Sequence, residues 1–313
     1  MNNKEFLKKI KDAGIIAINN LPSDYDYSIK GKTLILKLSN KAKKGIYGNM
    51  QDDSAAFESW SIILKYYCPN LINDVVIDWE ESGIKDQHYN RFIYRLTRFV
   101  QTYDWAKSAK HIPALPSLLC VSAPHDNTIS KKEECCLGSE DWLECDFIER
   151  NVSKYDIIDH QLPMGLFDGE ASNSTRYTPA NNCQLDIWAL KGDELSVFEL
   201  KKHDTNEIKD DANKPLGIIS ELMFYTNVMC DIIHHGILID ENKAKRAIQN
   251  KFRGFDKFYE IYKGTKAVTK IHAVFLAEEF HSNFCEDVLP LINDSVRLKR
   301  FNISYEMANP LVD

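Results

Sequence analysis

The sequence lacks any apolar run of membrane-spanning length. Apolar segments such as residues 14–18 are far shorter than the roughly 18 residues that a membrane helix needs. Residues 1–14 carry four lysines among polar residues and have no apolar core of signal-peptide length. Cysteine is also scarce, because 8 cysteines in 313 residues are too few for a disulfide scaffold. These absences predict a cytoplasmic chain with reduced thiols and no membrane association.

An excess of positive charge is missing as well. The chain has 39 basic and 46 acidic residues and a net charge of -7, which excludes a uniformly basic coat for nucleic acid but not a local basic patch. Hydrophobic residues make up 44% and charged residues 27%, an ordinary globular balance that excludes wholesale disorder. The length allows one large domain or two small ones.

Hydrophobic periodicity predicts a mixture of helices and strands. The expected helices are residues 4–20, 54–67, 86–105, 215–233 and a basic stretch at 243–263. The expected strands are residues 25–29, 33–38, 73–79, 236–240, 270–277 and a hairpin at 184–201. The periodicity fades over residues 107–179, where five prolines predict irregular structure. This mixture predicts the α/β or α+β class.

The domain organisation expected from this pattern has two parts. Residues 1–50 would form an N-terminal helix and strand pair. Residues 51–313 would form the main domain, with a helical and irregular insertion at about 86–179.

The hairpin at 184–201 is the segment that carries chemistry. Gly192 and Asp193 form a favourable two-residue turn, because glycine accepts a positive φ without a steric penalty. A turn at this place sets Asp186 opposite Glu199 on the paired strand. Side chains alternate along a strand, so the apolar residues share one face and the acids project from the other.

Two facing carboxylates and one lysine suggest a metal site. Like charges opposite one another on paired strands are destabilising, and a divalent cation between them removes the repulsion. Mg²⁺ suits Asp186 and Glu199 because it binds oxygen ligands and leaves several sites for water and phosphate. Lys201, two residues after Glu199, would orient an attacking water or offset phosphoryl charge. The alternative is an exposed hairpin face on which Lys201 simply neutralises Glu199.

This pattern resembles that of a known nuclease superfamily. Asp186 followed by Glu199-Leu200-Lys201 is similar to the Asp…(Glu/Asp)-x-Lys signature of the PD-(D/E)XK, or restriction-endonuclease-like, nucleases. In the next helix, Glu221 and Tyr225 resemble the Gln-x-x-x-Tyr element of RecB-type members, with Glu in place of Gln. The resemblance implies a mixed central sheet flanked by helices, whose core is a helix, three strands, a helix and a strand.

The resemblance also implies a function. It implies hydrolysis of phosphodiester bonds, in DNA above all, in a restriction, defence or repair context, with Mg²⁺ or Mn²⁺ as cofactor. It further suggests a homodimer, since many related nucleases dimerise to cut both strands.

The same resemblance gives roles to individual residues. Asp186 and Glu199 would bind the metal, and Lys201 would complete the catalytic group. Family members often carry a further metal-binding Glu on the first helix, and Glu58 is the residue expected there. An ordinary solvated carboxylate is the other interpretation of Glu58. Glu221 and Tyr225 would have secondary roles beside the metal site.

A basic stretch at 243–270 is the expected nucleic-acid contact. It contains nine basic residues against two acidic ones, interleaved with aromatic residues. In a nuclease its basic side chains would neutralise phosphates. The candidates are Lys245, Lys251, Arg253 and Lys257. The alternative is an amphipathic helix whose aromatic residues belong to the core and whose lysines are a solvated face.

Two other clusters have simpler interpretations. A group of cysteines and histidines lacks a Cys-x-x-Cys pair and is expected to be free thiols instead of a zinc or iron–sulfur site; it comprises Cys120, Cys135, Cys136, Cys145, His111 and His125. An acidic patch would repel nucleic acid, so we expect it away from the cleft or in a protein contact. It comprises Glu133, Glu134, Glu140, Asp141, Glu144, Asp146 and Glu149.

Two further function classes are compatible with these patterns. One is a catalytically inactive protein with the nuclease fold that binds nucleic acid. The other is a protein-interaction module that uses the acidic patch.

Overall fold

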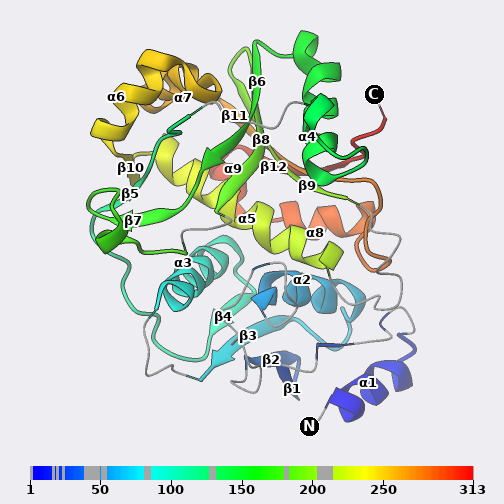
Figure 1. Cartoon of the computed structure of the whole chain (residues 1–313). Helices are drawn as coiled ribbons and strands as arrows, with labels where there is room; N and C mark the ends of the chain where they lie inside the picture. Colours follow the sequence, from blue (N-terminus) through cyan, green and yellow to red (C-terminus); the bar gives the residue numbers. More distant parts are fainter. Residues whose placement is uncertain are drawn as a thin grey trace. The chain divides into compact units, whose positions relative to one another are not determined.

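The structure is a computed structural model. It describes residues 3–15, 18, 21–22, 25–38, 50, 55–80, 86–126, 132–179, 183–202 and 214–312. The described residues form several mixed sheets flanked by helices, so the chain has the mixed α/β (α+β) architecture that the sequence predicts (Figure 1).

Contacts divide the chain into two discontinuous units. The first comprises Met1–Leu115, Thr205–Glu221 and Phe280–Lys299. The second comprises Pro116–Asp204, Leu222–Glu279 and Arg300–Asp313. The boundary expected at residue 50 therefore lies inside the first unit, and the segment expected as an insertion contributes to both units.

The first unit is built on a four-stranded sheet with the order β1-β2-β3-β4. Its strands are β1 (Tyr25–Lys30), β2 (Thr33–Leu38), β3 (Asp74–Trp79) and β4 (Ala106–Ser108). β1 and β2 pair antiparallel, whereas β2, β3 and β4 run parallel. Burial alternates along β3, as expected for a strand with one face against a core.

The helices of the first unit pack through aromatic side chains. They are α1 (Asn3–Asp12), α2 (Phe57–Tyr67), α3 (Gln87–Thr102) and α8 (Leu289–Asn293). Asp86 caps α3 by accepting a hydrogen bond from Tyr89 N, as its position before the apolar stripe predicts. The ring of Phe92 on α3 packs against Trp79 of β3 and Phe57 of α2. Helix α1 ends at Asp12, well before the predicted end at residue 20.

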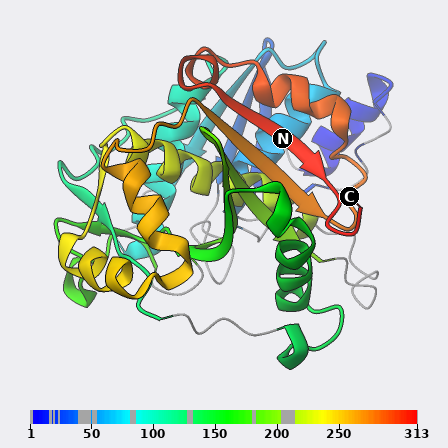
Figure 2. The ribbon, with the colours of Figure 1, turned by 90° about the horizontal axis from the view of Figure 1, so that it is seen from above.

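The second unit contains two sheets. The larger has the order β12-β11-β9-β8-β6, and the smaller has the order β10-β5-β7. The larger sheet is formed by β6 (Ile157–Pro163), β8 (Gln184–Lys191), β9 (Glu194–Lys201), β11 (Lys270–Ala277) and β12 (Ile303–Ala308). The smaller one is formed by β5 (Leu119–Val121), β7 (Leu166–Asp168) and β10 (Ile237–Ile239). β8 runs antiparallel to both neighbours, and β11 runs parallel to β9 and β12 (Figure 2).

Helices flank the larger sheet. Those within the second unit are α4 (Glu140–Asn151), α6 (Glu241–Asn250) and α7 (Phe255–Tyr262), and α9 (Val296–Phe301) spans the boundary. α5 (Lys214–Ile233) crosses the division between the units at Glu221. The 3₁₀ turn η5 (Phe252–Gly254) separates α6 from α7, so the predicted basic helical stretch is two helices with a break between them.

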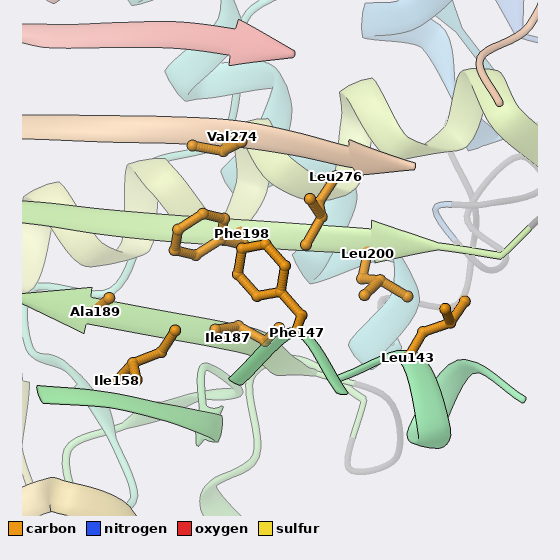
Figure 3. Packing of buried hydrophobic residues seen from close by; sticks show 9 residues of the cluster. All are labelled: Leu143, Phe147, Ile158, Ile187, Ala189, Phe198, Leu200, Val274 and Leu276. Atoms are coloured by element: carbon orange, nitrogen blue, oxygen red, sulfur yellow. The ribbon is translucent and has the colours of Figure 1, made fainter. Parts of the chain in front are cut away.

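An apolar cluster joins α4 to the larger sheet (Figure 3). Phe147 of α4 packs against Phe198 of β9, with ring centroids 5.3 Å apart. The cluster contains Leu143, Phe147, Ile158, Ile187, Ala189, Phe198, Leu200, Val274 and Leu276. The predicted apolar face of the hairpin is thus confirmed at four of these positions, two on each strand. The prediction of irregular structure over residues 107–179 is wrong for α4 and β6, because this cluster orders both of them.

Among the described residues, one helix is long and apolar enough to cross a membrane, contrary to the expectation that the sequence lacks such a run. It is the stretch Leu216–Ile233, of which 89% is buried inside the structure. Such burial is typical of the core helix of a water-soluble protein, so we interpret this stretch as a core helix.

Candidate metal centre

The hairpin that carries the predicted site has the expected register from its turn to the pair of Ile187 and Phe198. The backbone pairing of β8 with β9 ends there. Beyond it, Leu200 N donates a hydrogen bond of 2.7 Å to Asp186 Oδ2. The carboxylate of Asp186 therefore takes the place of a backbone acceptor, and it points at β9 beside Glu199.

Lys201 lies among acidic side chains. Its Nζ atom is 2.7 Å from Glu199 Oε1 and 3.4 Å from Glu140 Oε1. Glu199 is buried, with 2% of its side chain exposed. Burial raises the pKa of Asp186, and Lys201, which lies within electrostatic range, opposes this rise. The structure thus brings together the three residues that the hairpin pattern singled out.

Helix α4 adds two acids that sequence reasoning placed elsewhere. Glu140 and Glu144 lie one turn apart, and Glu144 is buried with 5% exposed. Glu144 Oε2 is 3.4 Å from His160 Nδ1 on β6. From the sequence, these two acids are expected away from the cleft or in a protein contact. The structure places both of them near Lys201, because Leu143 and Phe147 pack α4 onto the sheet.

The sequence does contain a signal for this helix. Trp142, Leu143 and Phe147 have helical spacing, and Ser139 precedes them as an N-cap that accepts from Trp142 N. An acid four residues after Glu140 then falls on the same side of the helix.

Burial and mutual repulsion control the charge of this cluster. Burial raises the pKa of Glu144 to about 8, and Glu140 and Asp141 raise it further, whereas Lys201 and a hydrogen bond from Gln161 lower it. Burial also raises the pKa of Asp186 well above its ordinary value, and Glu144 adds to this effect. Perturbed carboxyl groups beside a lysine are typical of functional sites.

The histidine beside Glu144 is kept neutral. Burial lowers the pKa of His160 to about 4, and the positive charge of Arg253 acts in the same direction, whereas Asp159 opposes it. A neutral imidazole both donates and accepts a hydrogen bond. His160 is therefore suited to support a carboxyl group in either protonation state.

The donor set fits a hard divalent cation. Carboxylate oxygens are the ligands that Mg²⁺ and Mn²⁺ prefer, and a cation would offset the burial and mutual repulsion that raise the pKa values of Glu144 and Asp186. Among the described ranges, no group of three or more His, Cys, Asp or Glu residues is arranged to hold an ion. Mg²⁺ commonly binds one or two carboxylates and keeps several waters, so two protein ligands such as Asp186 and Glu199 are compatible with it.

Glu58 lies in the first unit and has an ion-pair partner there. Its Oε1 atom is 2.9 Å from Arg95 Nε, Arg95 Nη2 binds Oε2, and Ser220 Oγ donates to Oε2 at 2.9 Å. Only 2% of Glu58 is exposed, so its interpretation as a solvated carboxylate is wrong. Its role as a metal ligand stays a prediction.

Glu221 and Tyr225 are both buried on α5, with 3% and 2% exposed. Glu221 is the last residue of a segment that belongs to the first unit, and Tyr225 belongs to the second unit. The ring of Tyr225 packs edge-on against Phe224 at 5.4 Å. Their secondary roles beside a metal stay predictions.

The basic stretch divides into exposed and buried parts. Lys245 and Lys251 are exposed, and the exposed Lys257 pairs with Glu260 at 2.8 Å. Arg253 is different, because it is 5% exposed and its Nη1 and Nη2 atoms donate to Gln161 O and Asp126 Oδ1 at 2.7 and 3.1 Å. Lys245 and Lys251 are exposed to solvent, where a phosphate group could reach them. Arg253 instead forms hydrogen bonds inside the second unit.

The remaining clusters are the cysteine and histidine group and the aromatic residues of the basic stretch. All eight cysteines are free thiols. The described parts of the cysteine and histidine group hold no metal-binding arrangement. Three aromatic residues of the basic stretch, Phe255, Phe258 and Tyr262, are buried, which favours the amphipathic interpretation for these side chains.

Comparisons with known proteins give no family. No protein-family model, curated protein or solved structure matches the chain.

Proposed function

We propose that this chain is a divalent-metal-dependent nuclease of the PD-(D/E)XK type that hydrolyses phosphodiester bonds, with DNA as the first substrate to test. One observation carries the proposal. Asp186, Glu199 and Lys201 meet at the end of the β8–β9 pairing, and Glu144 of α4 lies within electrostatic range of Asp186.

The order of elements supports this proposal. The expected core is a helix, three strands, a helix and a strand. The second unit contains α4, β6, β8, β9, the later part of α5 and β11 in this order, with β7 between β6 and β8, and with β10, α6 and α7 between α5 and β11. Strands β6, β8, β9 and β11 are neighbours in one sheet, with β11 parallel to β9. On this order of elements we propose Glu144, which precedes the three strands, as the helix acid in place of Glu58.

The chemistry of the site suits phosphodiester hydrolysis. A bound Mg²⁺ or Mn²⁺ would activate water and stabilise charge on the phosphoryl oxygens. Asp186 and Glu199 would hold the ion, and Glu144, which acts electrostatically on Asp186, would add negative charge beside it. Lys201 would orient the attacking water or offset phosphoryl charge. In the reaction the water oxygen bonds to phosphorus, one P–O ester bond breaks, and the water proton leaves while the departing oxygen gains one.

Burial of Glu199 has a consequence for Lys201. A buried carboxylate 2.7 Å from the ammonium group restrains the lysine at the site. The restrained charge costs little reorganisation during the reaction, which is the condition under which fixed charges are most effective.

The test is cleavage of plasmid and single-stranded DNA with Mg²⁺ or Mn²⁺. We expect the wild-type chain to cleave, and Asp186→Ala and Lys201→Ala to lose at least about 100-fold in rate. Lys191→Ala is the matched control, because Lys191 lies on the same hairpin, beside its turn. Equal rates in all four proteins would refute the assignment of the site.

A second candidate function is an inactive nuclease-fold protein that binds nucleic acid. It is favoured by the position of Lys201, whose ammonium group already compensates Glu199, and by the lack of a three-ligand group among the described residues. It predicts no metal-dependent cleavage but salt-sensitive binding that is lost when Lys245 and Lys251 are changed to Glu. A homodimer and a cytoplasmic location are further proposals, and light scattering in solution tests the first.

A further inference from the structure

Strand β6 has an unusual backbone conformation beside the proposed metal centre. Gln161 has a φ of 55°, in the left-handed region that a glutamine rarely adopts. It is also the residue at which the pairing of β6 with β8 is interrupted, at the step opposite Asp186. Strained residues of this kind persist only where the surrounding structure holds them, and they gather at functional sites.

The strained residue allows two consecutive side chains to reach the same acid. In a regular strand, neighbouring side chains point to opposite faces. Here His160 Nδ1 lies 3.4 Å from Glu144 Oε2, and the side chain of Gln161 also hydrogen-bonds Glu144. A regular β conformation at Gln161 would turn one of these two side chains away.

Arg253 holds Gln161 in this conformation. Its Nη1 atom donates a 2.7 Å hydrogen bond to the backbone oxygen of Gln161, and Nη2 donates to Asp126 Oδ1 at 3.1 Å. The two terminal nitrogens of the guanidinium group are therefore held by two different segments of the chain. Arg253 itself has a φ of 50°, so the chain adopts a rare conformation at both ends of this contact.

The packing of the turn around Arg253 is also close. Gly254 has a φ of 63°, and a Cβ atom there would lie 2.3 Å from Ile157 Cδ1 on β6. Any side chain at this place would have to displace the end of the Ile157 side chain. The turn η5 is thus pressed against the strand that carries His160 and Gln161.

We propose that Arg253 and Gln161 form a brace that positions Glu144 beside a metal ion held by Asp186 and Glu199, so that Arg253 is a positioning residue and not a phosphate contact. This inference rests on the proposed function, because it assigns a supporting group to the same metal site. It assigns the one arginine among the predicted nucleic-acid contacts to the interior of the second unit.

The first test measures binding of Mn²⁺ alone to the full chain by isothermal titration calorimetry. Loss of a supporting contact typically weakens metal affinity by about 10- to 100-fold, and we expect this for Gln161→Gly. Glycine adopts a positive φ readily, so Gln161→Gly keeps the backbone and should unfold at the wild-type temperature or above it. The matched control is Asn302→Gly, which makes the same kind of change at φ 50° on the exposed Asn302 of the same unit.

The second test uses Arg253→Lys, which keeps the charge but loses the two-pronged donor. We expect its Mn²⁺ affinity to fall by a similar factor, whereas Arg246→Lys on α6 should bind like wild type. DNA binding in EDTA should be unchanged by Arg253→Lys. In cleavage assays the Mg²⁺ concentration for half-maximal rate should rise, while the rate at saturating Mg²⁺ approaches that of wild type.

The outcomes separate this inference from the proposed function. If wild type binds Mn²⁺ and cleaves DNA but Gln161→Gly and Arg253→Lys bind Mn²⁺ equally well, only the brace is refuted. Weaker DNA binding by Arg253→Lys with unchanged Mn²⁺ affinity would make Arg253 a phosphate contact and would also refute the brace. If wild type binds no Mn²⁺, the proposed function and the brace fail together. Should Arg253→Lys not fold, Gln161→Gly still decides the question.

Discussion

Lys201 Nζ lies 2.7 Å from Glu199 Oε1, and the two residues are separated by a single position on β9. In a strand, residues two apart share a face, so this contact follows from the sequence spacing. The ammonium group also lies 3.4 Å from Glu140 Oε1 of α4. Lys201 therefore compensates acids that come from two elements.

This geometry predicts opposite effects on metal binding and on turnover. In Lys201→Met the positive charge that competes with a cation is removed, so Mn²⁺ should bind at least as tightly as in wild type. Cleavage should fall by at least about 100-fold, because the charge that orients water or offsets the phosphoryl group is lost. Calorimetry and a DNA cleavage assay measure the two quantities separately. A parallel loss of both would show that Lys201 holds the ligands in place instead.

Glu58 should matter for folding and not for metal binding. Its carboxylate forms a buried ion pair with Arg95, and Glu58→Ala leaves the guanidinium buried without that partner. Breaking a buried pair in this way costs about 3–5 kcal/mol of unfolding free energy. Glu80→Ala is the control, because Glu80 is 46% exposed and 3.7 Å from Lys37, and an exposed pair contributes at most about 1 kcal/mol.

Urea unfolding measures these differences. The milder Glu58→Gln should bind Mn²⁺ as wild type does if it remains folded. A specific loss of Mn²⁺ affinity in Glu58→Gln would support the metal-ligand role that the sequence predicts for Glu58.

Stability in EDTA should fall as the pH rises from about 5 to about 8. Burial raises the pKa of Glu144 from an ordinary 4.5 to about 8, so the folded chain keeps a proton that the unfolded chain releases in this window. The folded state binds more protons there, and its stability decreases by at most about 1.4 kcal/mol per pH unit for one such group.

The variant Glu144→Gln isolates this effect. It lacks the titrating group, so its unfolding free energy should depend less on pH between 5 and 8. Glu149→Gln on the same helix is the control, because Glu149 is exposed and pairs with Lys132. Urea titrations at several pH values compare the slopes. An identical slope in wild type and Glu144→Gln would contradict the assignment of a buried, protonated Glu144.

The exposed lysines of the basic stretch should contribute to DNA binding through counterion release. Each phosphate contact adds about 0.9 to the slope of log K against log salt concentration. Lys245→Ala and Lys251→Ala should each reduce this slope, whereas Lys257→Ala should reduce it less because Glu260 already pairs with Lys257 at 2.8 Å. Fluorescence anisotropy at several salt concentrations measures the slope. Unchanged slopes in all three variants would place the DNA contact elsewhere.

The part of the site that is local in sequence could be predicted. Gly192 fixes the turn, with a φ of 61°, and the turn fixes the register of β8 and β9 as far as Ile187 and Phe198. The spacing of Glu199 and Lys201 then places both side chains together. Such contacts depend on short-range geometry that the residue types dictate.

The part that depends on tertiary packing could not be predicted. Glu144 reaches the site because Leu143 and Phe147 dock α4 onto the sheet. The acids at positions 140, 141, 144, 146 and 149 are spread around the helix, so the sequence does not show which face is buried. Arg253 becomes an interior residue because rare backbone conformations turn η5 towards β6. From their charge alone, Glu144 and Arg253 would both be expected at the solvent-exposed surface.

The last prediction concerns Gly254, which is closely packed in the turn between α6 and α7. At Gly254 a Cβ atom would lie 2.3 Å from Ile157 Cδ1 and 3.1 Å from Trp188 Cζ2, and φ is 63°. Gly254→Ala therefore combines a left-handed conformation, at about 1–2 kcal/mol, with overpacking of about 1–3 kcal/mol. The flexible end of the Ile157 side chain can move, so we expect the cost of overpacking to be about 1 kcal/mol.

Gly192→Ala is the matched control for this change. Gly192 has a similar φ of 61° but no atom within 4 Å of the added Cβ, so only the conformational cost of about 1–2 kcal/mol should appear. Thermal and urea unfolding of both variants measure the difference. Because η5 presses on β6, Gly254→Ala should also weaken Mn²⁺ binding, whereas Gly192→Ala should not. Equal destabilisation by the two substitutions would show that η5 does not pack against Ile157 and Trp188 as described.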